Sequence, residues 1–136
     1  MVADLVGELL PLLRKENFNP YRNGVPRFRE LSYADQQEII AENPLYGHIV
    51  CRCETVTEGE IVDSIQRPVG ARNLDAVKRR VRAGMGRCQG GFCSPQVLEI
   101  LARELSLDPT EVTLFGGESQ ILIGKNREIG GFPHED

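Results

Sequence analysis

Apolar residues recur at intervals of three and four in several stretches of the chain, as they do on the buried face of a helix. Together with capping residues, this spacing predicts helices at about residues 3–15, 33–42, 58–66, 74–83 and 95–105. The intervening segments are rich in glycine, proline and asparagine, which interrupt regular structure. The pattern therefore predicts a mainly α fold, a small helical domain whose short helices are joined by loops.

Capping residues place the start of four of these helices. Ser32 and Asn73 can each accept a hydrogen bond from the first turn of the helix that follows. Thr57-Glu-Gly-Glu60 has the pattern of a capping box, and Ser94-Pro95 combines a serine cap with proline at the first helical position. Gly84 is placed to end the preceding helix in the left-handed conformation.

Extended backbone is predicted in two places. Ile49 and Val50 favour it just ahead of the first cysteine. Residues 112–115 and 120–123 flank two glycines, which predicts a short C-terminal hairpin. Residues 124–136 hold few apolar side chains and are expected to form a flexible tail.

The segment from residue 16 to residue 30 has no regular pattern but is unusually aromatic. Its two prolines, one glycine and three asparagines exclude a long regular element. Phe18, Tyr21 and Phe28 are too aromatic a set for a flexible linker. We expect residues 1–45 to form a helical arm and linker that lies partly on a surface outside this chain.

Length and composition indicate an ordinary globular protein. The chain has 136 residues, of which 40% are hydrophobic and none is tryptophan, enough for one modest core plus an extension. No apolar run approaches the roughly 18 residues of a membrane span, and no signal segment opens the chain. A cytoplasmic location is therefore expected.

Charge is unevenly distributed along the chain. The net charge is −4, yet residues 67–87 hold seven basic residues and one acid, Asp75. This block therefore carries +6 and the remainder −10. The total argues against a nucleic-acid partner, whereas the block predicts either a specific anionic neighbour or a charge that offsets a negative centre.

All four cysteines fall into two tight pairs, Cys51-x-Cys53 and Cys88-x4-Cys93. A [2Fe-2S] cluster takes four thiolates, two on each iron, so this arrangement predicts a [2Fe-2S] site. Residues two apart in extended backbone point to one side, so Cys51 and Cys53 are expected to face one iron. A helix beginning at Ser94 would put its positive end beside Cys93 and lower the pKa of that thiol.

Groups around the cysteines are expected to tune such a cluster. Glycines within residues 84–91 let the backbone approach and aim N–H groups at the sulfurs. Arg52 and Arg87 stand next to cysteines, where positive charge would stabilise the reduced state. His48 is interpreted as a loop residue or hydrogen-bond partner, because four cysteines leave no need for it as a ligand.

Two other interpretations of the cysteines are open. A structural zinc site would use the same four thiolates, although C-x-C spacing suits zinc poorly. Such a module would dock a protein partner through its basic helix. Two disulfides would require an oxidising compartment, to which nothing in the sequence points.

The stretches Cys51–Ile61, Leu74–Arg80 and Arg82–Cys93 resemble the C-terminal iron–sulfur domain of anaerobic glycerol-3-phosphate dehydrogenases and related FAD-dependent oxidoreductases. That domain belongs with bacterioferritin-associated ferredoxin, a small helical fold that holds [2Fe-2S] through four loop cysteines. In the bacterioferritin-associated ferredoxins the second cysteine pair is C-x2-C, whereas this chain has C-x4-C. This difference favours the dehydrogenase branch. The resemblance implies a BFD-like domain over residues 46–123. The implied cofactor and metal ligands are Cys51, Cys53, Cys88 and Cys93.

The resemblance also implies an electron-transfer role. FAD in a flavin domain would oxidise a substrate similar to glycerol 3-phosphate, and the cluster would pass electrons on singly to an acceptor protein or to another, membrane-associated subunit. No G-x-G-x-x-G opens a strand-to-helix unit here, so FAD is expected only in the missing parent domain, to which residues 1–45 would join. No catalysis is expected from this chain alone. Any contact with the inner membrane would be peripheral, through the parent enzyme.

Overall fold

The structure, a computed structural model, describes residues 4, 6, 7 and 16–124. Most of the predicted helix over residues 3–15 lies outside the described residues, as does the predicted tail apart from Gly124. In chain order the elements are the 3₁₀ turn η1 (Phe28–Glu30), α2 (Tyr33–Glu42), the 3₁₀ turn η2 (Pro44–Gly47), β1 (Ile49–Cys51), β2 (Val56–Thr57), α3 (Glu58–Gln66), α4 (Leu74–Val81), α5 (Ser94–Leu105) and the 3₁₀ turn η3 (Pro109–Glu111).

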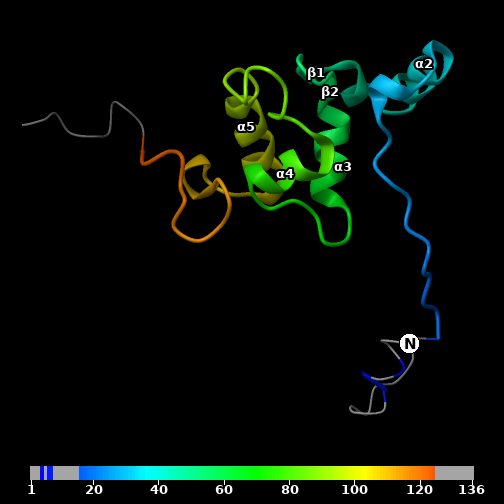
Figure 1. Cartoon of the computed structure of the whole chain (residues 1–136), viewed down its shortest axis with the longest axis horizontal. Coiled ribbons are helices and arrows are strands. Elements are labelled where there is room, and N and C mark those ends of the chain that lie inside the picture. The colour runs from blue at the N-terminus through cyan, green and yellow to red at the C-terminus, as the bar shows by residue number, and fades with distance from the viewer. Residues whose placement is uncertain (1–3, 5, 8–15, 125–136) are drawn as a thin grey trace, which may run out of the picture.

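The core lies where α3 meets α4 and α5 (Figure 1). Ile61 and Ile65 of α3 are at most 1% exposed, and Val77 of α4 and Leu101 of α5 are fully buried. Burying one such side chain contributes about 1.5–3 kcal/mol. Because α3 contacts both α4 and α5, it is the central element of this core.

A capping box starts α3, and the bounds of this helix are those that the sequence predicts. The Thr57 Oγ1 atom accepts from the Glu60 N–H at 3.3 Å, and a Glu60 carboxylate oxygen accepts from the Thr57 N–H at 2.7 Å. The other carboxylate oxygen of Glu60 accepts from the Phe28 N–H at 3.3 Å. The box therefore also fixes η1 against the domain.

The helix α2 lies to one side of this core (Figure 1), and it too has its predicted bounds, with Ser32 as its cap. The segment that follows is anchored by Tyr46 in η2, which is 2% exposed. The Tyr46 hydroxyl donates to Asp63 Oδ2 of α3 at 2.5 Å. Burial, followed by Asp63, raises the pKa of Tyr46 well above its usual value. This contact sets the position from which β1 enters the site.

The strands β1 and β2 form a two-stranded antiparallel sheet, with Ile49 opposite Thr57 and Cys51 opposite Val56. The domain therefore combines helices with a small sheet, which meets the expectation of a mainly α fold only in part. The sheet is too short to be stable alone. It gains stability because it continues directly into the buried first turn of α3.

The prediction of a C-terminal hairpin is wrong, because residues 112–123 form no regular strands. Over residues 112–123 the structure has one antiparallel bridge, Thr113 with Gln120, and a hydrogen bond of 2.8 Å from the Leu114 N–H to the Ser119 carbonyl. Residues 121–123 are at least 40% exposed. No buried face therefore favours continued pairing along the two arms.

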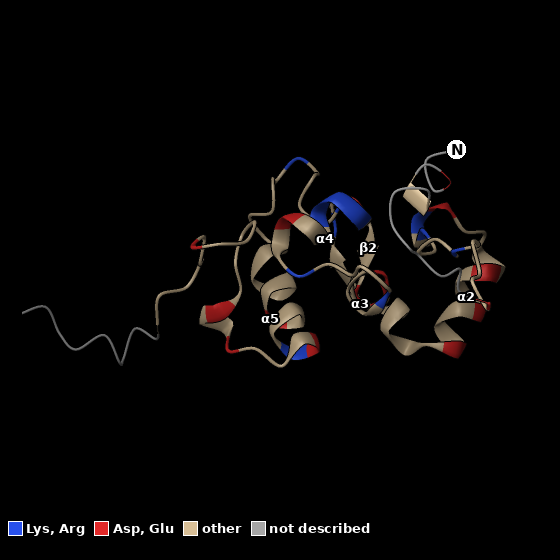
Figure 2. Ribbon diagram, turned by 90° about the horizontal axis from the view of Figure 1, so that it is seen from below, with Lys and Arg blue, Asp and Glu red and all other residues tan. Residues whose placement is uncertain are grey.

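The helix α4 ends two residues earlier than predicted, at Val81. Arg82, with φ of 68°, is the left-handed residue that ends the helix, the position expected of Gly84, which also has a positive φ of 87°. Its guanidinium Nε donates to Glu54 Oε2 at 2.7 Å, which holds the chain in this turn. Lysine and arginine residues, blue in Figure 2, lie in the last turn of α4, where their charge complements the negative end of the helix.

The segment before η1 contacts the domain through backbone carbonyls. Arg22 donates to the Pro68 carbonyl at 2.6 Å, and Arg67 donates to the Asn23 carbonyl at 2.9 Å. Phe18 and Tyr21 remain 70% and 87% exposed. That a surface outside this chain covers these aromatic rings therefore remains a prediction.

Candidate metal centre

The first cysteine pair is divided between a strand end and a turn. β1 ends at Cys51, which is 1% exposed, and residues 52–55 turn sharply, with Thr55 at a φ of 54°. Cys53 lies in that turn and is exposed. The expectation that the two side chains share one face of extended backbone is therefore wrong, because the strand does not reach Cys53.

The second pair is divided in the same way. Cys88 lies in the loop after α4 and is half-buried, whereas Cys93 is 2% exposed and occupies the N-cap position of α5. Ser94 was predicted to be the cap but is the first residue of the helix. The Ser94 N–H donates to the Gly90 carbonyl at 3.0 Å, so the loop is already turning as a helix when it reaches Cys93.

The sulfurs pair across the two motifs rather than within them. Cys53 Sγ and Cys88 Sγ are 3.4 Å apart, and the Cys51 thiol is the neighbouring side chain that contributes most to the raised pKa of Cys93. One cysteine of each motif thus contributes to an inner pair, Cys51 with Cys93, and the other to an outer pair, Cys53 with Cys88. The expectation that Cys51 and Cys53 face a single iron does not fit this arrangement.

Both pairs line one cavity of about 600 Å³. All four cysteines are free thiols, so the disulfide interpretation does not hold. Within the described part of the chain, no three His, Cys, Asp or Glu side chains converge as ligands of a single metal ion would. Two separate sulfur pairs at one cavity fit the two irons of a [2Fe-2S] cluster, each of which needs two thiolates.

The two pairs differ in their electrostatics. A hydrogen bond with Cys53, followed by the backbone N–H groups of Phe92, Gly90 and Gly91, lowers the pKa of Cys88. These N–H groups are the donors that the glycine-rich sequence predicts. They would offset the charge of a thiolate at Cys88, and of any cluster that it ligates.

Cys93 behaves in the opposite way. Burial, and then the neighbouring Cys51 thiol, raises the pKa of Cys93 to about 11. The expectation that the start of α5 lowers this pKa is therefore wrong, because burial of the Cys93 thiol is the dominant cause and raises its pKa. A coordinated metal would remove the proton outright.

Two glycines are required by close packing in the loop. A Cβ at Gly86 would collide with the Cβ of Cys53, and a Cβ at Gly90, where φ is 86°, would lie 2.6 Å from the Ser94 hydroxyl. The glycine-rich stretch therefore brings Cys88 close to Cys53 as well as supplying N–H donors.

The charged residues near the cysteines have unequal positions. Arg52 and Arg87 are both exposed, but only Arg52 lines the cysteine cavity. His48 also lines it, and its Nδ1 lies 2.6 Å from Glu58 Oε2. His48 is thus a hydrogen-bond partner, as the sequence predicts.

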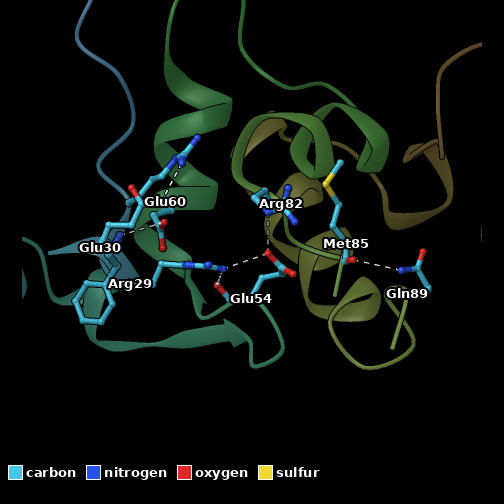
Figure 3. Close-up of polar contacts among 9 residues, drawn as sticks. Arg29, Glu30, Glu54, Glu60, Arg82, Met85 and Gln89 are labelled. Carbon is cyan, nitrogen blue, oxygen red and sulfur yellow. Dashed lines mark hydrogen bonds and ion pairs between the residues drawn. The ribbon is translucent and has the colours of Figure 1, made fainter. Parts of the chain in front are cut away.

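Sequence reasoning missed Glu54, which directly follows Cys53. Its carboxylate forms ion pairs with Arg82 at 2.7 Å and with Arg29 at 3.3 Å (Figure 3). The hydrogen bond from Arg82 helps to lower the pKa of Glu54. It thereby joins the turn at Cys53 to the end of α4 and to η1. The partners lie 28 and 25 residues away, so no short-range pattern could have identified them.

Comparison with known families matches this region. The family model of the BFD-like [2Fe-2S] binding domain covers residues 49–103, and these contain all four cysteines. Residues 49–103 are a BFD-like [2Fe-2S] binding domain. The family is defined by binding of an iron–sulfur cluster, and the crossed thiol pairs fit one.

The curated relatives of this chain named below are a dehydrogenase and components of an oxidase and a dehydrogenase. It is 59% identical over 114 residues to a glycerol 3-phosphate dehydrogenase from Caloramator mitchellensis, covering 84% of this chain and 24% of the relative. It is 37% identical over 87 residues to an opine oxidase component from Rhizobium meliloti, covering 63% and 16%. It is 36% identical over 64 residues to a component of the anaerobic glycerol-3-phosphate dehydrogenase of Escherichia coli (strain K12), covering 47% and 12%.

The chain thus spans a quarter or less of the length of these relatives. No solved structure matches it. Among its described residues, no helix has both the length and the apolar character needed to cross a membrane.

Proposed function

We propose that this chain is the iron–sulfur electron-transfer domain of an FAD-dependent oxidoreductase resembling glycerol-3-phosphate dehydrogenase. Its ligands would be Cys51, Cys53, Cys88 and Cys93. The observation that carries the proposal is the crossed arrangement of four free thiols at one cavity, within a segment that matches a [2Fe-2S] family. The bound cluster would supply one-electron chemistry.

The protein groups have separate tasks in this proposal. The inner pair is buried and excludes water from one side of the site. Backbone N–H groups around Cys88 compensate negative charge at the outer pair. Arg52 brings positive charge to the cavity, which favours the reduced state.

The partner would be a flavin domain of the same enzyme, from which electrons pass through this domain to a further acceptor. Support comes from the relatives, which are dehydrogenase and oxidase proteins several times longer than the matched segment. The substrate of the parent enzyme follows from resemblance alone, so glycerol 3-phosphate is the first compound to assay with the full-length enzyme.

The deciding experiment is anaerobic preparation of the chain with iron and sulfide, followed by absorption spectroscopy and metal analysis. We expect a brown protein with two irons and two sulfides per chain, bleached reversibly by dithionite. A colourless protein that takes up one zinc in preference, even with ample iron present, would support the structural zinc module instead.

A further inference from the structure

Five arginines from distant parts of the chain line a second cavity, of about 540 Å³. This arginine cavity is bounded by the segment leading to η1, by the chain after α3 and by the end of α4. It shares no lining residue with the cysteine cavity. Its arginines are Arg27, Arg29, Arg67, Arg80 and Arg82. The last three belong to the basic block that the proposed electron-transfer role leaves unexplained.

Carboxylates neutralise only part of this charge. Three glutamates line the same cavity, so five arginines and three glutamates leave a net charge of +2. Glu30 pairs with Arg27 at 3.0 Å, and Glu54 is shared between Arg29 and Arg82. Glu60 is occupied by its capping box.

The remaining two arginines have no carboxylate partner among the described residues. Arg80 donates to the carbonyls of Ala76 and Val69 at 3.1 and 3.0 Å. Arg67 donates to the Asn23 carbonyl. Carbonyls hold these guanidinium groups in place without cancelling their charge, and each guanidinium has five N–H donors.

Arg67 carries a further sign of a missing partner. Its Nε atom is buried and finds no hydrogen-bond acceptor in the part of the chain that the structure describes. About 90% or more of buried polar groups in proteins are hydrogen-bonded, so an exception calls for an explanation. A bound anion that accepts this N–H would provide one.

We propose that the arginine cavity is a binding site for a small phosphate-bearing anion. A phosphate group carries close to two negative charges at neutral pH, which matches the net charge of the lining. Guanidinium groups suit phosphate oxygens geometrically, because they donate two parallel hydrogen bonds. The volume lies within the usual range for small-molecule sites. Val25, Pro26, Val56 and Val81 also line it and could contact an organic group attached to the phosphate.

The first test uses the wild-type chain with its cluster and needs no variant. An isotope-labelled sample is titrated with inorganic phosphate, and separately with ethyl phosphate, at constant ionic strength. We expect saturable shifts of the Arg67 Nε–H signal and of the Gly24 and Val25 amides. Shifts that grow linearly without saturation, or an equal response to acetate, would overturn the proposal. Tighter binding of ethyl phosphate would indicate an organic phosphate, and equal binding would indicate inorganic phosphate.

The second test compares two variants that each lose two positive charges. Arg67→Gln/Arg80→Gln removes the two arginines without carboxylate partners, whereas Lys78→Gln/Arg79→Gln removes neighbouring charges that do not line the cavity. We expect the dissociation constant for phosphate to rise at least about tenfold in the first variant and less than about twofold in the second. Equal weakening in both would mean diffuse attraction to a basic surface, and the proposed site would be rejected.

Discussion

The inner and outer cysteine pairs contain the same residue type in opposite surroundings. Cys51 and Cys93 are at most 2% exposed and belong to the hydrophobic core. Cys53 is exposed and Cys88 half-buried, in loops held by a glycine contact and backbone N–H groups. The difference indicates that the inner pair joins a metal to the fold, whereas the outer pair presents it to solvent or to a partner.

The largest effect should come from Cys93→Ser in the inner pair. We expect it to lose the cluster and to destabilise the domain by at least ~2 kcal/mol, or about 8–16 °C in melting temperature, because a metal site contributes directly to folding. Iron content and thermal unfolding under anaerobic conditions measure both.

Cys53→Ser is the matched change in the outer pair. It should retain part of its iron with an altered spectrum, and its melting temperature should fall less. If Cys93→Ser kept full iron and an unchanged melting temperature, Cys93 would not be a ligand, and the distinction between the pairs would fail.

Gly86→Ala should disturb the outer pair without changing a ligand. The added methyl group would collide with Cys53, and overpacking of this kind costs about 1–3 kcal/mol. We expect lower iron occupancy and a lower urea midpoint. Gly47→Ala is the control, since its Cβ would lie an ordinary 3.6 Å from Ile40. Similar losses in both variants would show that the site is not specifically affected.

Arg52→Gln and Arg87→Gln test whether charge acts through the cavity. Removing positive charge should lower the midpoint potential, and solvent screening should limit the change to tens of millivolts. Because only Arg52 lines the cysteine cavity, we expect its variant to shift further. A redox titration of the two variants measures both midpoint potentials. A larger shift for Arg87→Gln would show that Arg87, and not Arg52, is the residue that tunes the potential.

The smallest effect should come from Glu58→Gln, at the start of α3. Burial opposes ionisation of Glu58, but hydrogen bonds from His48 and Arg103 outweigh it and lower the pKa of this carboxyl below its usual value. Its stabilisation should therefore be present above the pKa of the unfolded state, near 4.3, and be lost as pH falls through the folded pKa.

We expect Glu58→Gln to be less stable than wild type by about 0.5–1 kcal/mol at pH 7 and nearly equal to it at pH 3. Urea unfolding of both proteins at the two pH values measures the difference. A difference that is the same at both would assign Glu58 a role that does not depend on its charge.

The sequence predicted elements whose cause is local and missed those set by distant contacts. α2 and α3 have their predicted bounds because each cap and helix lie within a few residues. The end of α4 was misplaced because Arg82 is held by Glu54, 28 residues earlier. The cysteine motifs predicted a [2Fe-2S] site, but not the crossed pairing, which depends on a turn that only the folded chain reveals.

The crossed pairing has a consequence for folding. Cys53 and Cys88 are 35 residues apart, and the whole of α3 and α4 lies between them in the chain. A cluster that bridges them would act as a cross-link, and closing a loop of this length covalently restricts the unfolded chain by about 4 kcal/mol in the entropy model for disulfides. Much of the cluster's stabilising effect would then arise from conformations denied to the unfolded polypeptide. Loss of iron would restore those conformations, and the domain would unfold more readily even though the interactions that stabilise each helix are unchanged.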